Sequence, residues 1–526
     1  MIRQDRVIAM ISSCFGERVI IAKVHYNELH LEIDKNEIPI LAVKLRDWGF
    51  PLIQLTAADE RGNTGDFRLF YTFANDLENF LMIVSVSIAE TELSFPSITE
   101  VVPAAHWYER EIQDLFGLDS IGHPDKRCLA VHEDWPEGLY PLRKDFSLDS
   151  EVPRTEGRQS YDRVEGEGVM QVPVGPIHAG IIEPGHFLFS AVGDTVINLE
   201  ARLFFTHRGM EKLTEGKTPL DAFPIVERIC GACSFSHATS YCQAIEKLSG
   251  TEVSTRVQYI RTVVLELERL YNHVGDVGNI CAGVGFAFGT MHGARLKEDI
   301  MRLNETVFGS RFLRGINTPG GVRRDISVLD SDLILATLDK LELEFRELVE
   351  ILLDTNSYMD RVQTTGVLLN QIARDLHAVG PAARASGVDR DVRRDHPYAA
   401  YNRVSFKVPV YEQGDVLARV KVRIDETYES INIIRQILAS VPNGKLIQTL
   451  GEMIPYNYAI GMTESARGEN VHFIMIGKDQ TIYRYMVRSA SYVNWPVIPS
   501  TVPGNIIPDF PVINKSFELC YSCLDR

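Results

Sequence analysis

The chain has 526 residues, of which 45% are hydrophobic and 24% are charged, and its formal net charge is −17 at pH 7. This length predicts more than one domain, because single hydrophobic cores rarely grow beyond about 250–300 residues. The composition is typical of a folded soluble protein. The negative charge argues against a nucleic-acid partner, since phosphates would be repelled. No window approaches the ~18 consecutive apolar residues of a membrane span.

Residues 1–147 alternate strand-like and helical patterns, which predicts an α/β domain. Strand length and a β-branched or aromatic content occur at 18–24, 67–73 and 81–88. Residues 104–116 place apolar side chains at helical steps and are followed by Gly117. Residues 148–168 are rich in Ser, Asp, Glu, Gly and Arg with few apolar side chains, so we expect a linker there.

Residues 169–526 are predicted to form a second, mostly helical domain with small peripheral sheets. In 257–274 the apolar residues recur at steps of three and four, which indicates a helix with one buried stripe. Further helical patterns cover 288–308, 329–359 and 416–440, and strand-like runs occur at 472–476 and 481–486. The predicted fold class of the whole chain is therefore α+β.

The segment 106–117 is dense in charged and aromatic residues, and its composition alone favours a solvated amphipathic helix. It contains E-R-E-x-x-D-L-F-G at 109–117, and P-L-R-K-D follows at 141–145. These two motifs resemble the signature of the small hydrophilic subunit of respiratory complex I that sits beside its quinone-reducing subunit. The resemblance implies a docking and assembly role for residues 1–147, with no cofactor.

Two C-x-x-C pairs are the most informative feature of the chain: Cys230 with Cys233, and Cys520 with Cys523. Four thiolates make a soft-metal site. A structural zinc site is one interpretation, but zinc pairs usually lie about 12–20 residues apart, whereas here 234–519 separates them. A site assembled by the whole domain favours a catalytic centre. We expect Gly231 to let peptide N–H groups approach the sulfurs.

The residues around the pairs add two further expectations. Nearby cations should offset the thiolate charge, and the candidates are Arg228, His237 and Arg467. The scattered cysteines are expected to be buried, small hydrophobic residues, and they are Cys14, Cys128, Cys242 and Cys281.

With these motifs in place, the second domain resembles the large subunit of nickel–iron hydrogenases. The resemblance rests on R-I-C-G-A-C at 228–233 with His237, and on C-x-x-C-x-x-R at 520–526. The complex-I-related, membrane-bound branch of the formate hydrogenlyase type is indicated by G-P-I-H at 175–178, H-R-G-M-E-K at 207–212 and F-L-R-G-x-x-x-P-G-G-V at 312–322.

The resemblance implies a role for each cysteine. Cys230 and Cys520 would be terminal ligands of nickel. Cys233 and Cys523 would bridge nickel to an iron that also holds carbon monoxide and cyanide. Cys520 would additionally take part in catalysis, as the sulfur that holds a proton.

The resemblance also implies roles for residues around the metals. Arg467 would lie over the open metal positions, and Glu183 would accept a proton from Cys520. His237 would lie near a cysteine sulfur without binding metal. Ser500 and Thr501 would form a hydroxyl loop that hydrogen-bonds a cyanide.

Two departures from the family pattern concern the end of the chain. Glu518-Leu519 replaces the usual D-P before the last pair, and Arg526 replaces the terminal histidine of uptake hydrogenases. Arg526 cannot ligate a metal, which argues against a magnesium ion there, for which Glu211 is the candidate ligand. The end three residues after Cys523 matches the cut that a maturation protease makes in the family, so we expect a mature chain.

The expected function is the interconversion of protons, electrons and H₂, with H₂ evolution as the direction. The expected partners are an iron–sulfur small subunit related to the cluster-bearing subunit of complex I, a ferredoxin-like electron-transfer subunit, integral membrane subunits and a formate dehydrogenase. The expected location is the cytoplasmic side of the inner membrane. The alternative is a quinone-site scaffold subunit of a complex-I-like oxidoreductase without nickel and iron.

Overall fold

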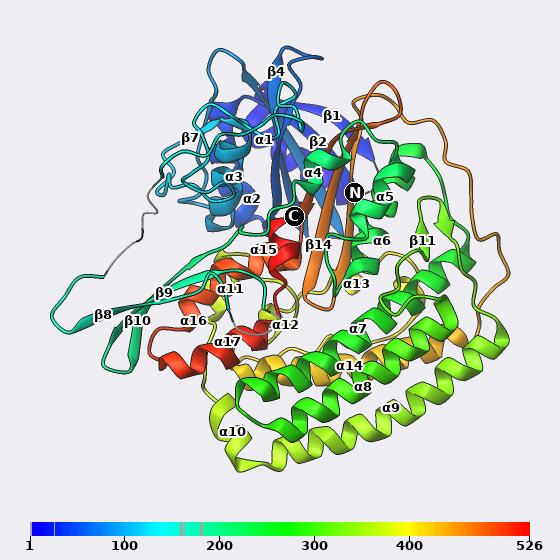
Figure 1. Ribbon diagram of the computed structural model, residues 1–526. Coiled ribbons are helices and arrows are strands. Elements are labelled where there is room, and N and C mark those ends of the chain that lie inside the picture. Colours follow the sequence, from blue (N-terminus) through cyan, green and yellow to red (C-terminus); the bar gives the residue numbers. More distant parts are fainter. Residues whose placement is uncertain (1–2, 26, 158–160, 162–163, 179–181) are drawn as a thin grey trace. The chain divides into compact units, whose positions relative to one another are not determined.

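The computed structural model describes residues 3–25, 27–157, 161, 164–178 and 182–526 (Figure 1). The chain divides into two compact units. The first comprises Met1–Asp162, Arg202–His207 and Asp375–His377, and the second comprises Arg163–Ala201, Arg208–Arg374 and Ala378–Arg526. Among the described helices, none combines the length and the apolar character needed to cross a bilayer.

The first unit is built on a five-stranded sheet in the order β1-β2-β5-β4-β3. Its strands are β1 (Val19–His25), β2 (Glu28–Ile33), β3 (Leu52–Asp59), β4 (Asp66–Asn75) and β5 (Phe80–Ala89). The pair β2–β5 is parallel and the other neighbours are antiparallel. The helices are α1 (Arg3–Phe15), α2 (Ile38–Asp47) and α3 (His106–Phe116), and β6 (Ser94–Pro96) pairs with β7 (Asp119–Ile121). The three predicted strands all appear.

The charged residues of α3 are buried, so the interpretation of this segment as a solvated helix is wrong. Glu109 is fully buried and accepts hydrogen bonds from the Ile98 N–H at 2.8 Å and the Thr99 hydroxyl at 2.9 Å. Asp114 accepts from the N–H groups of Leu129 and Ala130 at 2.7 and 2.8 Å. Burial raises the pKa of Asp114 to about 6, against these hydrogen bonds. Glu109 and Asp114, the acids of the motif at 109–117, therefore hold the neighbouring loops at 98–99 and 129–130 by hydrogen bonds.

Long helices dominate the second unit (Figure 1). They are α6 (Ser234–Ser249), α7 (Thr255–Gly283), α8 (Ala287–Phe308), α9 (Val328–Asp354) and α14 (Val416–Leu438). The helices α7 and α8 approach closely where Gly278 faces Gly293, since a Cβ on Gly278 would lie 2.9 Å from the Cα of Gly293. The helix predicted at 329–359 is interrupted at Thr355, which is extended (φ −89°, ψ 104°), and continues as α10 (Asn356–Val362).

Two three-stranded sheets complete the second unit and carry residues of the later site. One contains β8 (Val169–Val174), β9 (His186–Val192) and β10 (Thr195–Arg202), and the connection between β8 and β9 includes Glu183. The other contains β13 (Tyr458–Ser465), β14 (Gly468–Ile476) and β15 (Ile482–Arg488), all antiparallel. With an N-terminal α/β unit and a mainly helical second unit, the predicted α+β fold class is confirmed.

Candidate metal centre

The two cysteine pairs meet at one place inside the second unit. Cys230 follows α5 (Pro219–Val226), and Cys233 directly precedes α6. Cys520 is the N-cap of α18 (Tyr521–Asp525), which contains Cys523. The ligand atoms of Cys230, Cys233, Cys523 and His237 all lie within 4.8 Å of one another. Cys520 packs against the same cluster.

Each pair has the same local geometry, because the second cysteine N–H donates to the first sulfur. The distance is 3.3 Å from the Cys233 nitrogen to the Cys230 sulfur and 3.3 Å from the Cys523 nitrogen to the Cys520 sulfur. Gly231 is not needed for this approach, since a Cβ there would meet nothing within 4 Å. The expected approach of a peptide N–H to the sulfur is present, but it does not depend on the glycine. The turn between the first pair is instead held by α7, whose Tyr271 hydroxyl donates to the Ala232 carbonyl at 2.7 Å.

The donor set fits soft divalent metals. All four cysteines are free thiols, and the sulfurs of Cys230 and Cys233 are 2.9 Å apart. The contact with Cys230, together with burial, raises the pKa of Cys520 to about 12. Burial and the neighbouring cysteines raise the pKa of Cys523 well above its ordinary value. Nickel and iron bind soft thiolate ligands and displace the protons of the thiols. Binding of these metals here would therefore relieve the unfavourable crowding of four protonated cysteines.

Arg467 is the cation that the structure brings to this region. It lies in the tight turn between β13 and β14, and its guanidinium donates to the Asn272 side chain at 2.6 Å and to the Glu518 carbonyl at 2.8 Å. The Asp276 carboxylate lies 3.2 Å away. Burial by itself lowers the pKa of Arg467, but the carboxylates of Asp276 and Glu518 outweigh burial and raise it. The side chain therefore stays charged.

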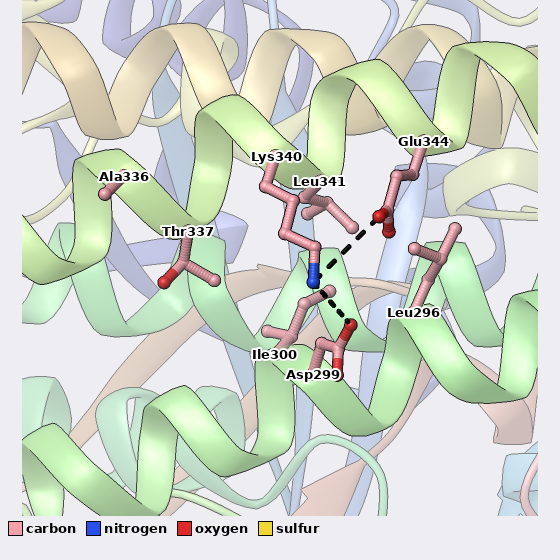
Figure 2. Close-up of a pocket in the computed structure, with 8 residues that line it drawn as sticks. All are labelled: Leu296, Asp299, Ile300, Ala336, Thr337, Lys340, Leu341 and Glu344. Atoms are coloured by element: carbon pink, nitrogen blue, oxygen red, sulfur yellow. Dashed lines mark ion pairs between the residues drawn. The ribbon is translucent and has the colours of Figure 1, made fainter.

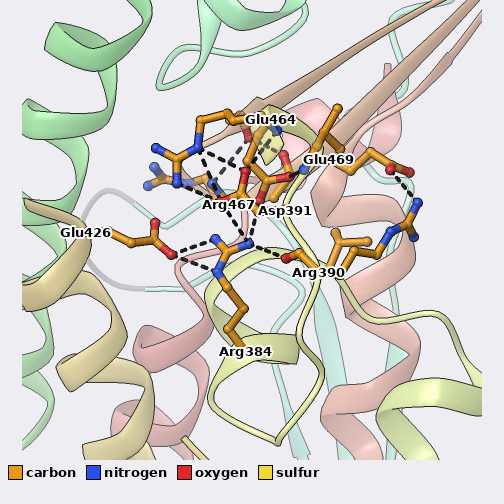
Figure 3. Close-up of polar contacts among 12 residues, drawn as sticks. Arg384, Arg390, Asp391, Glu426, Glu464, Arg467 and Glu469 are labelled. Atoms are coloured by element: carbon orange, nitrogen blue, oxygen red, sulfur yellow. Dashed lines mark hydrogen bonds and ion pairs between the residues drawn. The ribbon is translucent and has the colours of Figure 1, made fainter. Parts of the chain in front are cut away.

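A network of buried ion pairs holds the turn that carries Arg467 (Figure 3). Arg384 contacts Glu464 at 2.9 Å and Glu426 at 2.7 Å, and Arg390 contacts Glu469 at 2.7 Å. The two glutamates at 464 and 469 flank the turn in β13 and β14. Because each carboxylate is paired, the charges can stay buried and the turn is fixed against the helices.

Arg228 is not a cation of the cluster, contrary to the sequence expectation. It is exposed, and its guanidinium donates to the Pro224 carbonyl at 2.6 Å. The scattered cysteines also differ from expectation. Cys242 and Cys281 are buried as predicted, but Cys14 is exposed and Cys128 is half-buried.

Glu183 lies beside Cys520. Its carboxylate accepts the Ser522 N–H at 2.8 Å and is 4.0 Å from the Cys520 sulfur. A carboxylate at this distance can exchange a proton with the sulfur after a small side-chain movement. The proposed proton role of Glu183 is compatible with this position and stays a prediction.

Glu211 is enclosed by arginines. Its two carboxylate oxygens contact Arg526 at 2.8 Å and Arg484 at 2.7 Å, and it also accepts the Val487 N–H at 3.1 Å. Despite burial, the two guanidiniums lower the pKa of Glu211. The two guanidiniums therefore already neutralise the carboxylate that a magnesium ion would need as a ligand. Arg208 joins the same region, since its guanidinium donates to the carbonyls of Ile229 and Ser522 at 3.0 and 2.6 Å.

The hydroxyls of the predicted cyanide-binding loop donate to their own chain. Ser500 donates to the Val497 carbonyl at 2.6 Å and Thr501 donates to the Ile498 carbonyl at 2.8 Å. Within the described residues neither hydroxyl has a hydrogen bond to a cysteine of the site. Their role stays a prediction.

Sequence analysis missed several buried polar residues of this site. Glu268 on α7 accepts the N–H groups of Phe235 and Ser236 at 2.6 and 2.9 Å, and burial raises its pKa to about 8. His472 on β14 contacts His237 at 2.9 Å. Neither residue belongs to a recognisable motif. Glu268 falls within the helical stretch 257–274, whose apolar period was its only visible signal.

A surface pocket between α8 and α9 does not belong to this site (Figure 2). Lys340 lies 3.8 Å from Asp299 and 3.9 Å from Glu344 there. The lining residues are Leu296, Asp299, Ile300, Ala336, Thr337, Lys340, Leu341 and Glu344. None of them is a cysteine or a histidine, so the pocket offers no soft-metal ligand.

Comparison with known proteins covers nearly the whole chain. The family models that match are described as "Respiratory-chain NADH dehydrogenase, 49 Kd subunit" (residues 283–456 and 446–526), "Respiratory-chain NADH dehydrogenase, 30 Kd subunit" (31–152) and "Nickel-dependent hydrogenase" (208–276). A solved structure of the membrane-bound sulfane sulfur reductase, an archaeal respiratory membrane complex, contains a chain that matches with a TM-score of 0.64. That chain is 27% identical and is 99% covered, while 68% of the present chain is covered.

Two curated relatives come from Escherichia coli (strain K12). Formate hydrogenlyase subunit 5 is 37% identical, with 95% of this chain and 89% of the relative covered. Hydrogenase-4 component G is 38% identical, with 89% of this chain and 82% of the relative covered.

A cluster of four cysteines in a fused 30 Kd–49 Kd arrangement defines a class, the complex-I-like subunits with a cysteine-rich site. With relatives of this identity and coverage, the chain belongs to the family of complex-I-related nickel–iron hydrogenase large subunits of the formate hydrogenlyase type. The family was predicted correctly from sequence, and the quinone-site scaffold is not favoured.

Proposed function

We propose that this chain is the catalytic large subunit of a membrane-bound nickel–iron hydrogenase that evolves H₂ within a formate hydrogenlyase-like complex. The observation that carries the proposal is the meeting of Cys230, Cys233 and Cys523 within 4.8 Å, with Cys520 packed against them. A structural zinc site would need no charged arginine and no carboxylate beside a sulfur, and this cluster has both nearby.

In this proposal the thiolates of Cys230, Cys233, Cys520 and Cys523 would hold nickel and iron, and the iron would carry carbon monoxide and cyanide. The bound centre would supply the redox chemistry that makes and splits H₂. The Cys520 sulfur would hold the proton and Glu183, 4.0 Å away, would accept it and pass it outward. Arg467 would contribute a fixed positive charge that does not titrate at working pH.

The wider assembly is proposed on the same basis. Residues 1–147 would form a docking domain, 148–168 a linker and 169–526 the catalytic domain. Electrons would reach the site through a ferredoxin-like subunit and an iron–sulfur small subunit, because among the described residues the one group of cysteines that could hold a metal is the site above. Integral membrane subunits would hold the chain at the cytoplasmic face of the inner membrane, and a formate dehydrogenase would supply electrons.

The test is metal analysis and infrared spectroscopy of protein made together with its maturation machinery. We expect nickel and iron at close to one each per chain, and bands from iron-bound carbon monoxide and cyanide. Cys520→Ala should abolish reduction of methyl viologen by H₂. Cys242→Ala is the control, because Cys242 is a buried cysteine that lies in the apolar core outside the cluster, and it should keep activity. Absence of nickel from the matured protein would refute the proposal.

A further inference from the structure

A chain of three buried side chains leads away from the Cys523 sulfur. The His237 Nε2 atom lies 3.6 Å from that sulfur, and the His237 Nδ1 atom lies 2.9 Å from Nε2 of His472. The Nδ1 atom of His472 in turn lies 2.9 Å from the Tyr485 hydroxyl. The chain runs from α6 to β14 and β15, and His237, His472 and Tyr485 are all fully buried.

The direction of these hydrogen bonds can be derived from the far end of the chain. Among the described residues the Tyr485 hydroxyl has one hydrogen-bond partner, the Nδ1 atom of His472. The hydroxyl must donate there, because otherwise its proton would be buried without an acceptor, which folded proteins avoid. Nδ1 of His472 is then an acceptor, and a neutral imidazole with an accepting Nδ1 carries its proton on Nε2.

The same constraint passes to the next ring. The Nε2–H of His472 donates to Nδ1 of His237, so His237 carries its own proton on Nε2, facing the Cys523 sulfur. Burial, with the neighbouring His237 ring and the Arg488 guanidinium, lowers the pKa of His472 well below its ordinary value, which keeps this ring neutral.

We propose that Tyr485 and His472 are positioning residues that fix the tautomer of His237 and thereby keep an N–H donor aimed at the Cys523 sulfur. Neither residue touches the cysteines. Their effect is to hold a hydrogen-bond donor on the Cys523 sulfur, which withdraws electron density from it. The consequence for a bound iron rests on the proposed function, whereas the tautomer itself does not.

The first test reads the tautomer directly in the full chain made without nickel. Nitrogen-15 NMR of labelled histidines distinguishes the two neutral forms, and the His237 signal is identified by its loss in His237→Gln. We expect the Nε2–H form in the wild type. Tyr485→Phe should convert part or all of His237 to the Nδ1–H form. His472→Gln should preserve the Nε2–H form, because a carboxamide can accept from Tyr485 and donate to His237.

Tyr241→Phe is the matched control. Tyr241 is buried beside Tyr485, with ring centroids 5.6 Å apart, but its hydroxyl donates to the Pro219 carbonyl at 2.9 Å. This variant should leave the His237 signal unchanged. An Nδ1–H form of His237 in the wild type, or an unchanged His237 signal in Tyr485→Phe, would overturn the inference.

The second test uses the metal-loaded chain. Loss of the N–H donor makes Cys523 a stronger electron donor, so the infrared band of iron-bound carbon monoxide should shift to lower wavenumber in Tyr485→Phe and stay in place in Tyr241→Phe. An equal shift in both variants, or none in Tyr485→Phe, would contradict the positioning role. If no carbon monoxide band appears in any protein, the proposed function fails while the NMR result still decides the tautomer.

Discussion

The contact between Glu211 and two arginines gives the sharpest stability prediction. In Glu211→Gln the side-chain oxygen can still accept the Val487 N–H, but the guanidiniums of Arg526 and Arg484 lose the negative charge of Glu211. All three side chains are at least 95% buried. Removing one partner from such a buried ionic contact costs about 3–5 kcal/mol, because two buried guanidiniums lose the negative charge that lies between them.

Amide hydrogen exchange of the C-terminal segment measures this loss locally. The N–H groups of Leu524 and Arg526 donate to the carbonyls of Cys520 and Ser522. If the segment opens more easily by about 3–5 kcal/mol, these amides should exchange roughly 10²–10⁴-fold faster at pH 7. The mass-spectrometric exchange rate of peptides covering 520–526 is the measurement.

The surface offers a matched control. Glu298 also accepts from two arginines, Arg311 at 2.6 Å and Arg302 at 3.0 Å, but its side chain is 33% exposed. Glu298→Gln should therefore change stability little, because solvent screens the contact. Equal and small effects of the two variants would refute the assignment of Glu211 as a buried ionic anchor.

The pH dependence follows from the lowered pKa of Glu211. For an acid whose folded pKa is depressed, the stabilisation is complete above its unfolded pKa, about 4.3, and is lost as the pH falls through the folded value. The difference between the wild type and Glu211→Gln should thus be constant from pH 7 to about 5 and should shrink only in more acidic solution. A difference that already declines between pH 7 and 6 would contradict this.

Three further predictions concern the site itself. Arg526 and Arg484 supply the positive charge at Glu211, so removal of magnesium with a chelator should leave H₂ turnover and thermal stability unchanged. A loss of turnover or stability that added magnesium restores would contradict this prediction. Glu183→Gln should slow hydrogen–deuterium exchange with the gas roughly 10²-fold at unchanged nickel content, and normal exchange would remove Glu183 from the proton path. Arg467→Lys keeps the positive charge but loses the planar guanidinium that donates to both Asn272 and the Glu518 carbonyl. Turnover measured with methyl viologen should therefore fall roughly 10²-fold. Wild-type turnover in this variant would show that the charge alone suffices.

Local sequence patterns were sufficient for many of the longer elements and for the two cysteine pairs. The strands β1, β4 and β5 of the first unit follow from strand length and β-branched or aromatic content. The long helices α7, α8 and α14 follow from apolar residues at steps of three and four, although α7 is buried on all sides from Ile260 to Val274 and not along one stripe. The cysteine pairs were visible because a C-x-x-C spacing brings two sulfurs to one side of a turn. A pattern of this kind is complete within a few residues, so it needs no knowledge of the remaining chain.

Tertiary structure decided the surroundings of those ligands. Whether Arg228 or Arg467 is the cation near the cysteines could not be read from the sequence, since both are arginines beside short motifs. The burial of Glu109 and Asp114 was hidden by their charge, which composition assigns to solvent.

The partners of Glu211 and the direction of the His237–His472–Tyr485 chain likewise depend on residues separated by more than 200 positions or on neighbouring strands. The physical reason is that a buried polar group is stable only with its partners, and folding alone selects which distant side chains those partners are. The sequence by itself determined the cysteine pairs and the family; the three-dimensional fold determined which charged and hydrogen-bonding side chains surround the cysteines.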